Sequence, residues 1–136
     1  MIKGLKYKQV NKLILIALLS FNSAAGSGAG GRTLPPDEKW HEADYVYHHC
    51  QGEVEHVLPD RTRVDCLTET HAIEYDWGKK WAEAIGQSLY YSAMTGKKAG
   101  IVLIVNPRTK DRYLKRINTA IDANNLDIQV WTILKK

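Results

Sequence analysis

The strongest constraint on the fold is the run at residues 100–105, in which a glycine is followed by five aliphatic residues. A continuously apolar strand is typical of a parallel strand that is covered on both faces. Residues 79–94, which end just before Gly96, and residues 110–124 have apolar residues at helical spacing. Residues 127–134 are predicted to form a last strand. This order of helix, strand, helix and strand predicts a sheet with a parallel part and helices packed on it.

The preceding part of the chain predicts one more helix and a three-stranded meander. Residues 36–49 are predicted to be helical, because a proline suits the first turn and Gly52 follows the end. Residues 53–58, 63–68 and 71–75 are predicted to be antiparallel strands joined by tight turns. The predicted fold class is therefore α/β, a three-layer mixed β-sheet with flanking helices in the order αβββαβαβ.

The first 25 residues have the pattern of a signal peptide. Four lysines precede an apolar run at residues 13–19, and small residues follow it up to Ala25. The run is too short to span a bilayer, so no membrane anchor is expected after cleavage. We predict an exported protein, periplasmic or secreted, with a flexible lead-in at residues 26–35 and a single domain at residues 36–136.

The formal charge of +4 comes entirely from the four lysines of this first segment, so the rest of the chain is formally neutral. A neutral domain does not attract nucleic acid through its overall field. Any contact with DNA or RNA would have to come from a local patch of cations.

Cys50 and Cys66 are the only cysteines. In an oxidising compartment such a pair is interpreted first as a disulfide. Closing the loop between them would stabilise the fold by about 3 kcal/mol. Two buried free thiols are the alternative.

A tight turn at residues 69–70 would place Asp65 directly opposite Glu74 on neighbouring strands. Like charges in this position destabilise a sheet, which indicates a compensating cation. Mg²⁺ prefers hard oxygen ligands and commonly takes only one or two protein carboxylates. Asp65 and Glu74 are therefore candidate metal ligands, and Glu53 or Glu55 on the preceding strand is a candidate outer ligand.

The helix predicted after this hairpin carries polar residues on one face. Glu83, Gln87 and Tyr91 recur every four residues and would share that face with Lys79 or Lys80. Gln87 and Tyr91 would hold a phosphate or one end of a substrate there. A lysine ammonium would offset charge that develops in a transition state, and we assign this role to Lys80.

Structural interpretations of the same residues remain open. Arg63 would lie opposite Asp76 in this register, so the hairpin face could be an ion-paired surface without a metal. Lys79 and Lys80 could be ordinary charges at a helix end. The five histidines lack the spacing of a transition-metal site, and the aromatic residues are expected in the core and at its rim rather than as stacking platforms.

The chain resembles the PD-(D/E)XK nuclease superfamily, whose core is a helix, three strands, a helix and a strand. Asp65 falls at the aspartate of the family motif, and Glu74-Tyr75-Asp76 falls at its Glu-x-Lys. Gln87 and Tyr91 match the Gln-x-x-x-Tyr signature of some exonuclease branches. The resemblance covers roughly residues 36–105.

This resemblance implies an exported nuclease with a restriction-endonuclease-like fold, which hydrolyses phosphodiester bonds of DNA or RNA with Mg²⁺ or Mn²⁺. Asp65 and Glu74 would hold the metal. The chain departs from the motif at Asp76, which occupies the lysine position, and Lys79 or Lys80 would supply the cation instead. Because of this departure, the alternative is a catalytically inactive relative that binds a protein or nucleic-acid partner in the periplasm. A third hypothesis is an exported structural protein.

Overall fold

The computed structural model describes residues 39–136, which lie within one compact unit of the chain. Its elements, in order, are α1 (Glu42–His49), β1 (Glu53–Val57), β2 (Arg63–Leu67), β3 (His71–Trp77), the 3₁₀ turn η1 (Gly78–Lys80), α2 (Trp81–Thr95), β4 (Lys98–Val105), α3 (Lys110–Ala123) and β5 (Ile128–Leu134). The predicted order αβββαβαβ is confirmed. The predicted signal peptide and lead-in lie outside the described residues.

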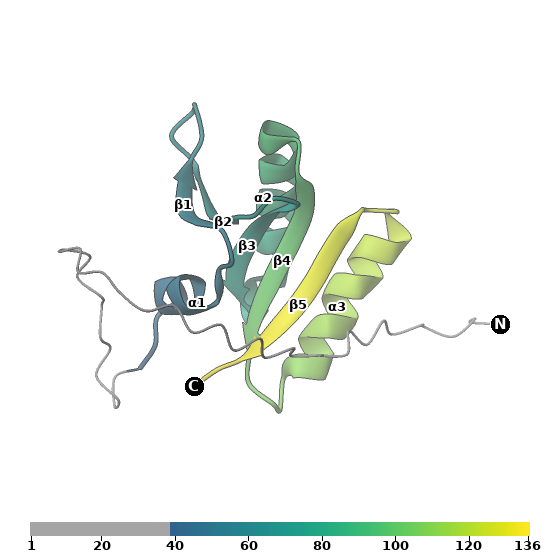
Figure 1. Cartoon of the computed structure of the whole chain (residues 1–136). Coiled ribbons are helices and arrows are strands. Elements are labelled where there is room, and N and C mark those ends of the chain that lie inside the picture. The colour runs from purple at the N-terminus through teal and green to yellow at the C-terminus, as the bar shows by residue number, and fades with distance from the viewer. Residues whose placement is uncertain (1–38) are drawn as a thin grey trace, which may run out of the picture. The chain divides into compact units, whose positions relative to one another are not determined.

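The five strands form one mixed sheet in the order β1-β2-β3-β4-β5 (Figure 1). The first three strands are antiparallel neighbours, and β3, β4 and β5 run parallel. The predicted burial of the central parallel strand is confirmed, because β4 is buried from its second residue to its last. A parallel strand needs cover on both faces, and the helices provide it.

Two layers of helices enclose the sheet. On one face, Ile117 and Ile121 of α3 and Ala84 of α2 pack against Ile101 and Leu103 of β4. A second core cluster, on the other face, contains residues of α1, β2, β3 and β4: Tyr45, Val46, Cys66, Ile73, Tyr75, Val102 and Ile104. The fold is therefore the predicted three-layer α/β arrangement. Within residues 39–136, no helix combines the length and the apolar character needed to cross a membrane.

Two predicted boundaries are wrong in ways that affect the site. Within the described residues the first helix begins at Glu42 and residues 39–41 of the predicted helix are not helical, because the Asp44 carboxylate accepts a hydrogen bond from the His41 N–H at 2.8 Å and so fixes the first turn there. Residues 36–38 lie outside the described part of the chain. The helix after the meander begins at Trp81, and Lys79 and Lys80 lie in the preceding 3₁₀ turn. Both lysines therefore stand between β3 and α2 rather than on the helix.

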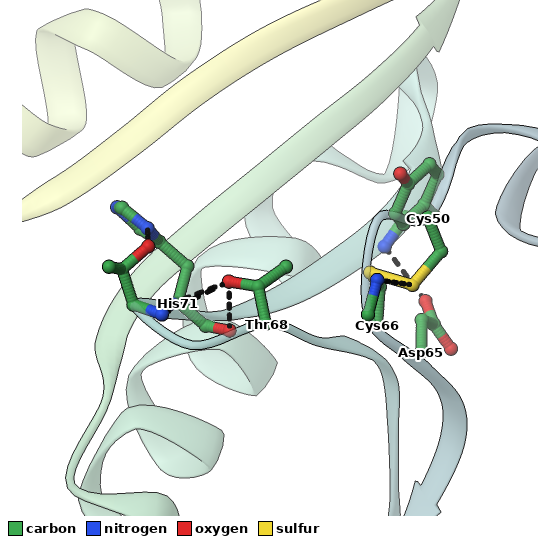
Figure 2. The surroundings of a disulfide bond; sticks show 8 residues. Cys50, Asp65, Cys66, Thr68 and His71 are labelled. Atoms are coloured by element: carbon green, nitrogen blue, oxygen red, sulfur yellow. Dashed lines mark hydrogen bonds between the residues drawn. A yellow bond between two sulfur atoms is a disulfide. The ribbon is translucent and has the colours of Figure 1, made fainter. Parts of the chain in front are cut away.

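The β2–β3 hairpin has the predicted turn and register. The Thr68 N–H donates to the His71 carbonyl at 2.9 Å, and Cys66 pairs with Ile73. Figure 2 shows the predicted disulfide between Cys50, just after α1, and Cys66 on β2. The bond ties α1 to the strand that carries Asp65.

Reduction of this disulfide is expected to lower the free energy of unfolding by about 3 kcal/mol, because it frees the closed loop of the unfolded chain. Urea unfolding with and without a reductant measures the difference. A variant with both Cys50→Ser and Cys66→Ser serves as the control and should not respond to the reductant. Equal midpoints for the wild-type protein in both conditions would contradict the expectation.

Candidate active site

One cavity, of about 450 Å³, brings all five candidate side chains together. They are Asp65, Glu74, Lys80, Gln87 and Tyr91. These residues come from β2, β3, the 3₁₀ turn and α2, so the cavity lies where the meander meets the helix that follows it. Asp76 also lines it. We call this space the acidic cavity.

The floor of the acidic cavity is formed by two carboxyl groups of β3. Glu74 and Asp76 are two residues apart and therefore point to the same face of the sheet. Only 4% of Glu74 and 1% of Asp76 is exposed to solvent. Charged side chains are almost never buried to this degree without a partner.

Asp65 is held beside these groups by a backbone donor. Its Oδ2 accepts a hydrogen bond from the Tyr75 N–H at 2.7 Å, just past the Cys66–Ile73 pair of the hairpin. The Asp65 carboxylate thus takes the place of a backbone carbonyl of β2 as the acceptor for this N–H of β3. Figure 2 shows Asp65 beside the disulfide-bonded Cys66, so the covalent bond and the hydrogen bond both fix this part of β2.

Two buried oxygens of the cavity floor have no hydrogen-bond partner. They are Glu74 Oε2 and Asp76 Oδ2. Most buried polar side-chain atoms in folded proteins are hydrogen-bonded, so each exception requires an explanation. Two such oxygens in one cavity are available to accept a hydrogen bond or to bind a cation.

The carboxyl groups of the cavity are hard to ionise together. Burial, and then the charges of Asp65, Asp76 and Glu42, raise the pKa of Glu74 to about 9. Burial is also the main cause that raises the pKa of Asp65 to about 6, against the opposing effect of the Tyr75 N–H. Burial and the charge of Asp76 raise the pKa of Glu42 to about 7. Burial likewise raises the pKa of Asp76.

Lys80 is the cation nearest to this cluster. Its Nζ lies 3.5 Å from Asp76 Oδ1 and 3.7 Å from Glu83 Oε2. The charge of Asp76 raises the pKa of the Lys80 ammonium, which is therefore charged at neutral pH. Lys79, the other candidate, lines a different cavity. Glu83 pairs with Lys80 but does not line the acidic cavity.

The structure corrects the expected ion-pair partner of Arg63 and decides between the two candidate outer ligands, Glu53 and Glu55. The ion pair of Arg63 is with Glu55, whose Oε2 lies 3.1 Å from its Nη1, and not with Asp76; on the other edge of the strand, the β2–β3 backbone pairs are Cys66 with Ile73 and Leu67 with Ala72. The expected pair of Arg63 with Asp76 is therefore replaced by two others, Arg63 with Glu55 and Lys80 with Asp76. Of the two candidate outer ligands, Glu55 lines the cavity and Glu53 does not.

Sequence reasoning missed three further residues of the cavity: Glu42, Arg61 and Thr62. Glu42 reaches it from the first turn of α1, and Arg61 reaches it from the β1–β2 turn, where its φ is +72°. No local pattern pointed to either residue. Arg61 follows a Pro-Asp pair that predicted only a turn, and Glu42 reaches the site only because α1 packs beside β3.

The donor set of the acidic cavity fits a hard divalent cation. Among the described residues, no group of three or more His, Cys, Asp or Glu side chains is arranged to hold a metal ion. Mg²⁺, however, commonly binds through one or two carboxylates and completes its shell with water and substrate phosphate. Asp65 and Glu74, with the unpartnered Oε2 of Glu74, meet this smaller requirement.

In comparisons with known proteins, no family model, curated protein or solved structure matches the chain.

Proposed function

We propose that the protein is an exported, divalent-metal-dependent nuclease with a restriction-endonuclease-like fold of the PD-(D/E)XK type. The observation that carries the proposal is the pair of buried, unpartnered carboxylate oxygens of Glu74 and Asp76 in a cavity that also holds the Lys80 ammonium. Carboxylates that face a cation and an open space suit phosphodiester hydrolysis, in which a metal and a lysine act on one phosphate.

Asp65 and Glu74 are the proposed ligands of Mg²⁺ or Mn²⁺. When bound, such an ion lowers the pKa of an attacking water and polarises the phosphodiester. The Tyr75 N–H holds Asp65 in its orientation, and the disulfide at Cys66 holds β2 from the other side. Support of this kind keeps ligands in the geometry that the metal requires.

Lys80 is the proposed catalytic cation. Its ammonium stabilises negative charge that develops on the phosphate oxygens, which is the part that the motif lysine plays in the superfamily. Asp76 stands at the motif lysine's position in the sequence, yet it attracts the Lys80 ammonium to 3.5 Å. Asp76 is therefore a positioning residue, and the departure from the motif is compatible with an active enzyme.

The rim of the acidic cavity provides the contacts for the substrate. Arg61 and Arg63 line it, and guanidinium groups suit phosphate because they donate two parallel hydrogen bonds. Gln87 and Tyr91 add polar groups from α2. These cations form the local patch that a formally neutral domain needs in order to bind nucleic acid.

The disulfide also supports the proposed location outside the cytoplasm. Disulfides persist in oxidising compartments and are rare in the cytosol. The Cys50–Cys66 bond therefore supports export to the periplasm or the medium, where the substrate would be nucleic acid outside the cytoplasm.

Cleavage of fluorescently labelled DNA and RNA with Mg²⁺ or Mn²⁺ tests the proposal. Lys80→Met keeps the aliphatic stem and removes the charge, so kcat is expected to fall by about a hundredfold or more while metal binding remains. Lys115→Met, at an exposed position of α3, is the matched control and should leave the rate unchanged. Folded, metal-bound wild-type protein that cleaves neither nucleic acid would refute the proposal.

A further inference from the structure

A second cavity, of about 430 Å³, adjoins the acidic one. The end of β3 and the 3₁₀ turn separate the two: Asp76 and Lys80 line the acidic cavity, and Trp77, Gly78 and Lys79 line the second. The second cavity lies at the ends of β3 and β4, beside the start of α3. Ligands of α/β sheets commonly bind outside the carboxyl ends of parallel strands.

Aromatic rings line this second cavity, and their positions are fixed. The Tyr45 ring makes edge-to-face contacts with Trp40 at 5.1 Å and with Trp77 at 5.8 Å between ring centroids. A side chain at Gly78 would place its Cβ 2.6 Å from the Tyr113 ring, so the glycine allows this ring to lie against the backbone. Trp40, Trp77 and Tyr113 are half-buried. His48 stacks on Trp40 at 4.6 Å between ring centroids and Lys136 Nζ lies 4.0 Å from the centre of that ring, so Trp77 and Tyr113 are the rings left for a base.

The charge of this cavity is opposite to that of its neighbour. Lys39, Lys79 and Lys135 line it, and none of the described residues that line it is a carboxylate. Lys135 Nζ lies 5.5 Å from the centre of the Trp77 ring, so a cation and an aromatic face meet there. We call this space the aromatic-lysine cavity.

We propose that the aromatic-lysine cavity binds one nucleotide of the substrate strand, with its base against the aromatic rings and its phosphate on the lysines. The inference rests on the proposed nuclease function and adds the class of substrate to it. Aromatic platforms combined with cations bind single strands, since only an unpaired base offers its face for stacking. The enzyme therefore acts on single-stranded nucleic acid, or on single-stranded ends, in preference to duplexes.

In this arrangement the neighbouring residues Lys79 and Lys80 contact different phosphates of the bound strand. Lys80 serves the scissile phosphate in the acidic cavity, and Lys79 holds a flanking phosphate across the wall between the cavities. Lys79→Ala should therefore raise KM with a smaller effect on kcat, whereas loss of Lys80 acts on kcat. A strand bound in this way runs past residues 77–80.

The test uses thymidine 5′-monophosphate as the probe, with EDTA present, and follows the tryptophan fluorescence of the protein. Saturable quenching is expected, with much weaker effects from thymidine and from inorganic phosphate, because each has only half of the recognised groups. Lys79→Ala and Lys135→Ala should each weaken the affinity by about tenfold, as expected for the loss of a charge-assisted hydrogen bond. Lys115→Ala is the matched control and should bind as the wild type does.

A second measurement uses a short single-stranded oligonucleotide at several salt concentrations. Loss of one phosphate contact in Lys79→Ala should reduce the slope of log affinity against log salt by about 0.7. Absence of saturable binding, or equal binding of phosphate and nucleotide, would overturn the inference. An unchanged affinity and salt slope in Lys79→Ala would overturn it as well.

The outcome is separable from that of the nuclease proposal. Asp65→Asn removes a proposed metal ligand but leaves the aromatic-lysine cavity intact, so it should retain nucleotide binding in EDTA. Nucleotide binding by a protein that cleaves nothing would support this cavity's role and refute the nuclease. Cleavage by a protein that does not bind the nucleotide, or that cuts duplex as fast as single strands, would refute this inference alone.

Discussion

Removal of either proposed metal ligand, by Asp65→Asn or Glu74→Gln, is expected to lower the rate of metal-dependent cleavage by at least about a hundredfold. Each substitution keeps the size of the side chain and removes its ability to carry a negative charge. Loss of even an outer partner of a metal ligand commonly costs about ten- to a hundredfold, so loss of a direct ligand should cost more. Initial rates on a labelled single-stranded substrate at saturating Mg²⁺ measure the effect.

The matched control is Glu69→Gln, an exposed carboxylate at the turn of the same hairpin. It makes the same change from carboxyl to amide but does not touch the acidic cavity, so its rate should equal that of the wild type. Circular dichroism verifies that each variant is folded. A folded Glu74→Gln variant that retains cleavage would mean that this carboxylate does not bind the metal.

The same Glu74→Gln substitution is expected to stabilise the metal-free protein at alkaline pH. Glu74 has a pKa near 4.5 when unperturbed and about 9 in the fold. Between these values the folded state binds a proton that the unfolded state has lost, so the free energy of unfolding falls as pH rises from about 4.5 towards 9. The amide has no proton to lose, and its advantage at pH 9 should be on the order of a few kcal/mol.

Urea unfolding in EDTA at pH 5, 7 and 9 measures this dependence. The wild type should lose stability over the series, and the variant should lose much less, with Asp65, Glu42 and Asp76, whose pKa values are also raised, accounting for what remains. Glu69→Gln again serves as the control, with the pH dependence of the wild type. Parallel pH profiles for the wild type and Glu74→Gln would show that burial of this carboxyl group has no energetic consequence.

If Glu74→Gln both loses activity and gains stability, then the buried carboxyl group destabilises the metal-free fold. Stability increases in the variant that loses activity, which is the usual relation when a functional site is strained or poorly satisfied. In the proposed function the cation offsets the cost of burying Glu74, because metal binding requires the deprotonated carboxylate.

The sequence predicted the parts of the fold that depend on local patterns. The apolar run of β4, the helical spacing of α2 and α3, and the turn before His71 each carry their signal within a few residues. The carboxylate pairing followed from the turn alone, since register in a hairpin is fixed by its loop. Asp65 and Glu74 therefore came together as predicted.

The remaining features depend on packing between distant segments. Lys80 rather than Lys79 enters the acidic cavity because a 3₁₀ turn precedes α2, and helical spacing contained no sign of that turn. The aromatic-lysine cavity joins Trp40, Trp77 and Tyr113, which are far apart in the sequence. The aromatic residues were expected to be core and rim, and only the packing of α1 and α3 around the ends of the strands places these three beside lysines.

The most direct test of the account is calorimetric titration of Mg²⁺ and Mn²⁺ into the wild-type protein, Asp65→Asn and Glu74→Gln at neutral pH. We predict saturable binding to the wild type, accompanied by release of protons as Glu74 ionises, and no binding to either variant. Folded wild-type protein that binds neither ion, or variants that bind as tightly as the wild type, would contradict the proposal that the acidic cavity is a metal site.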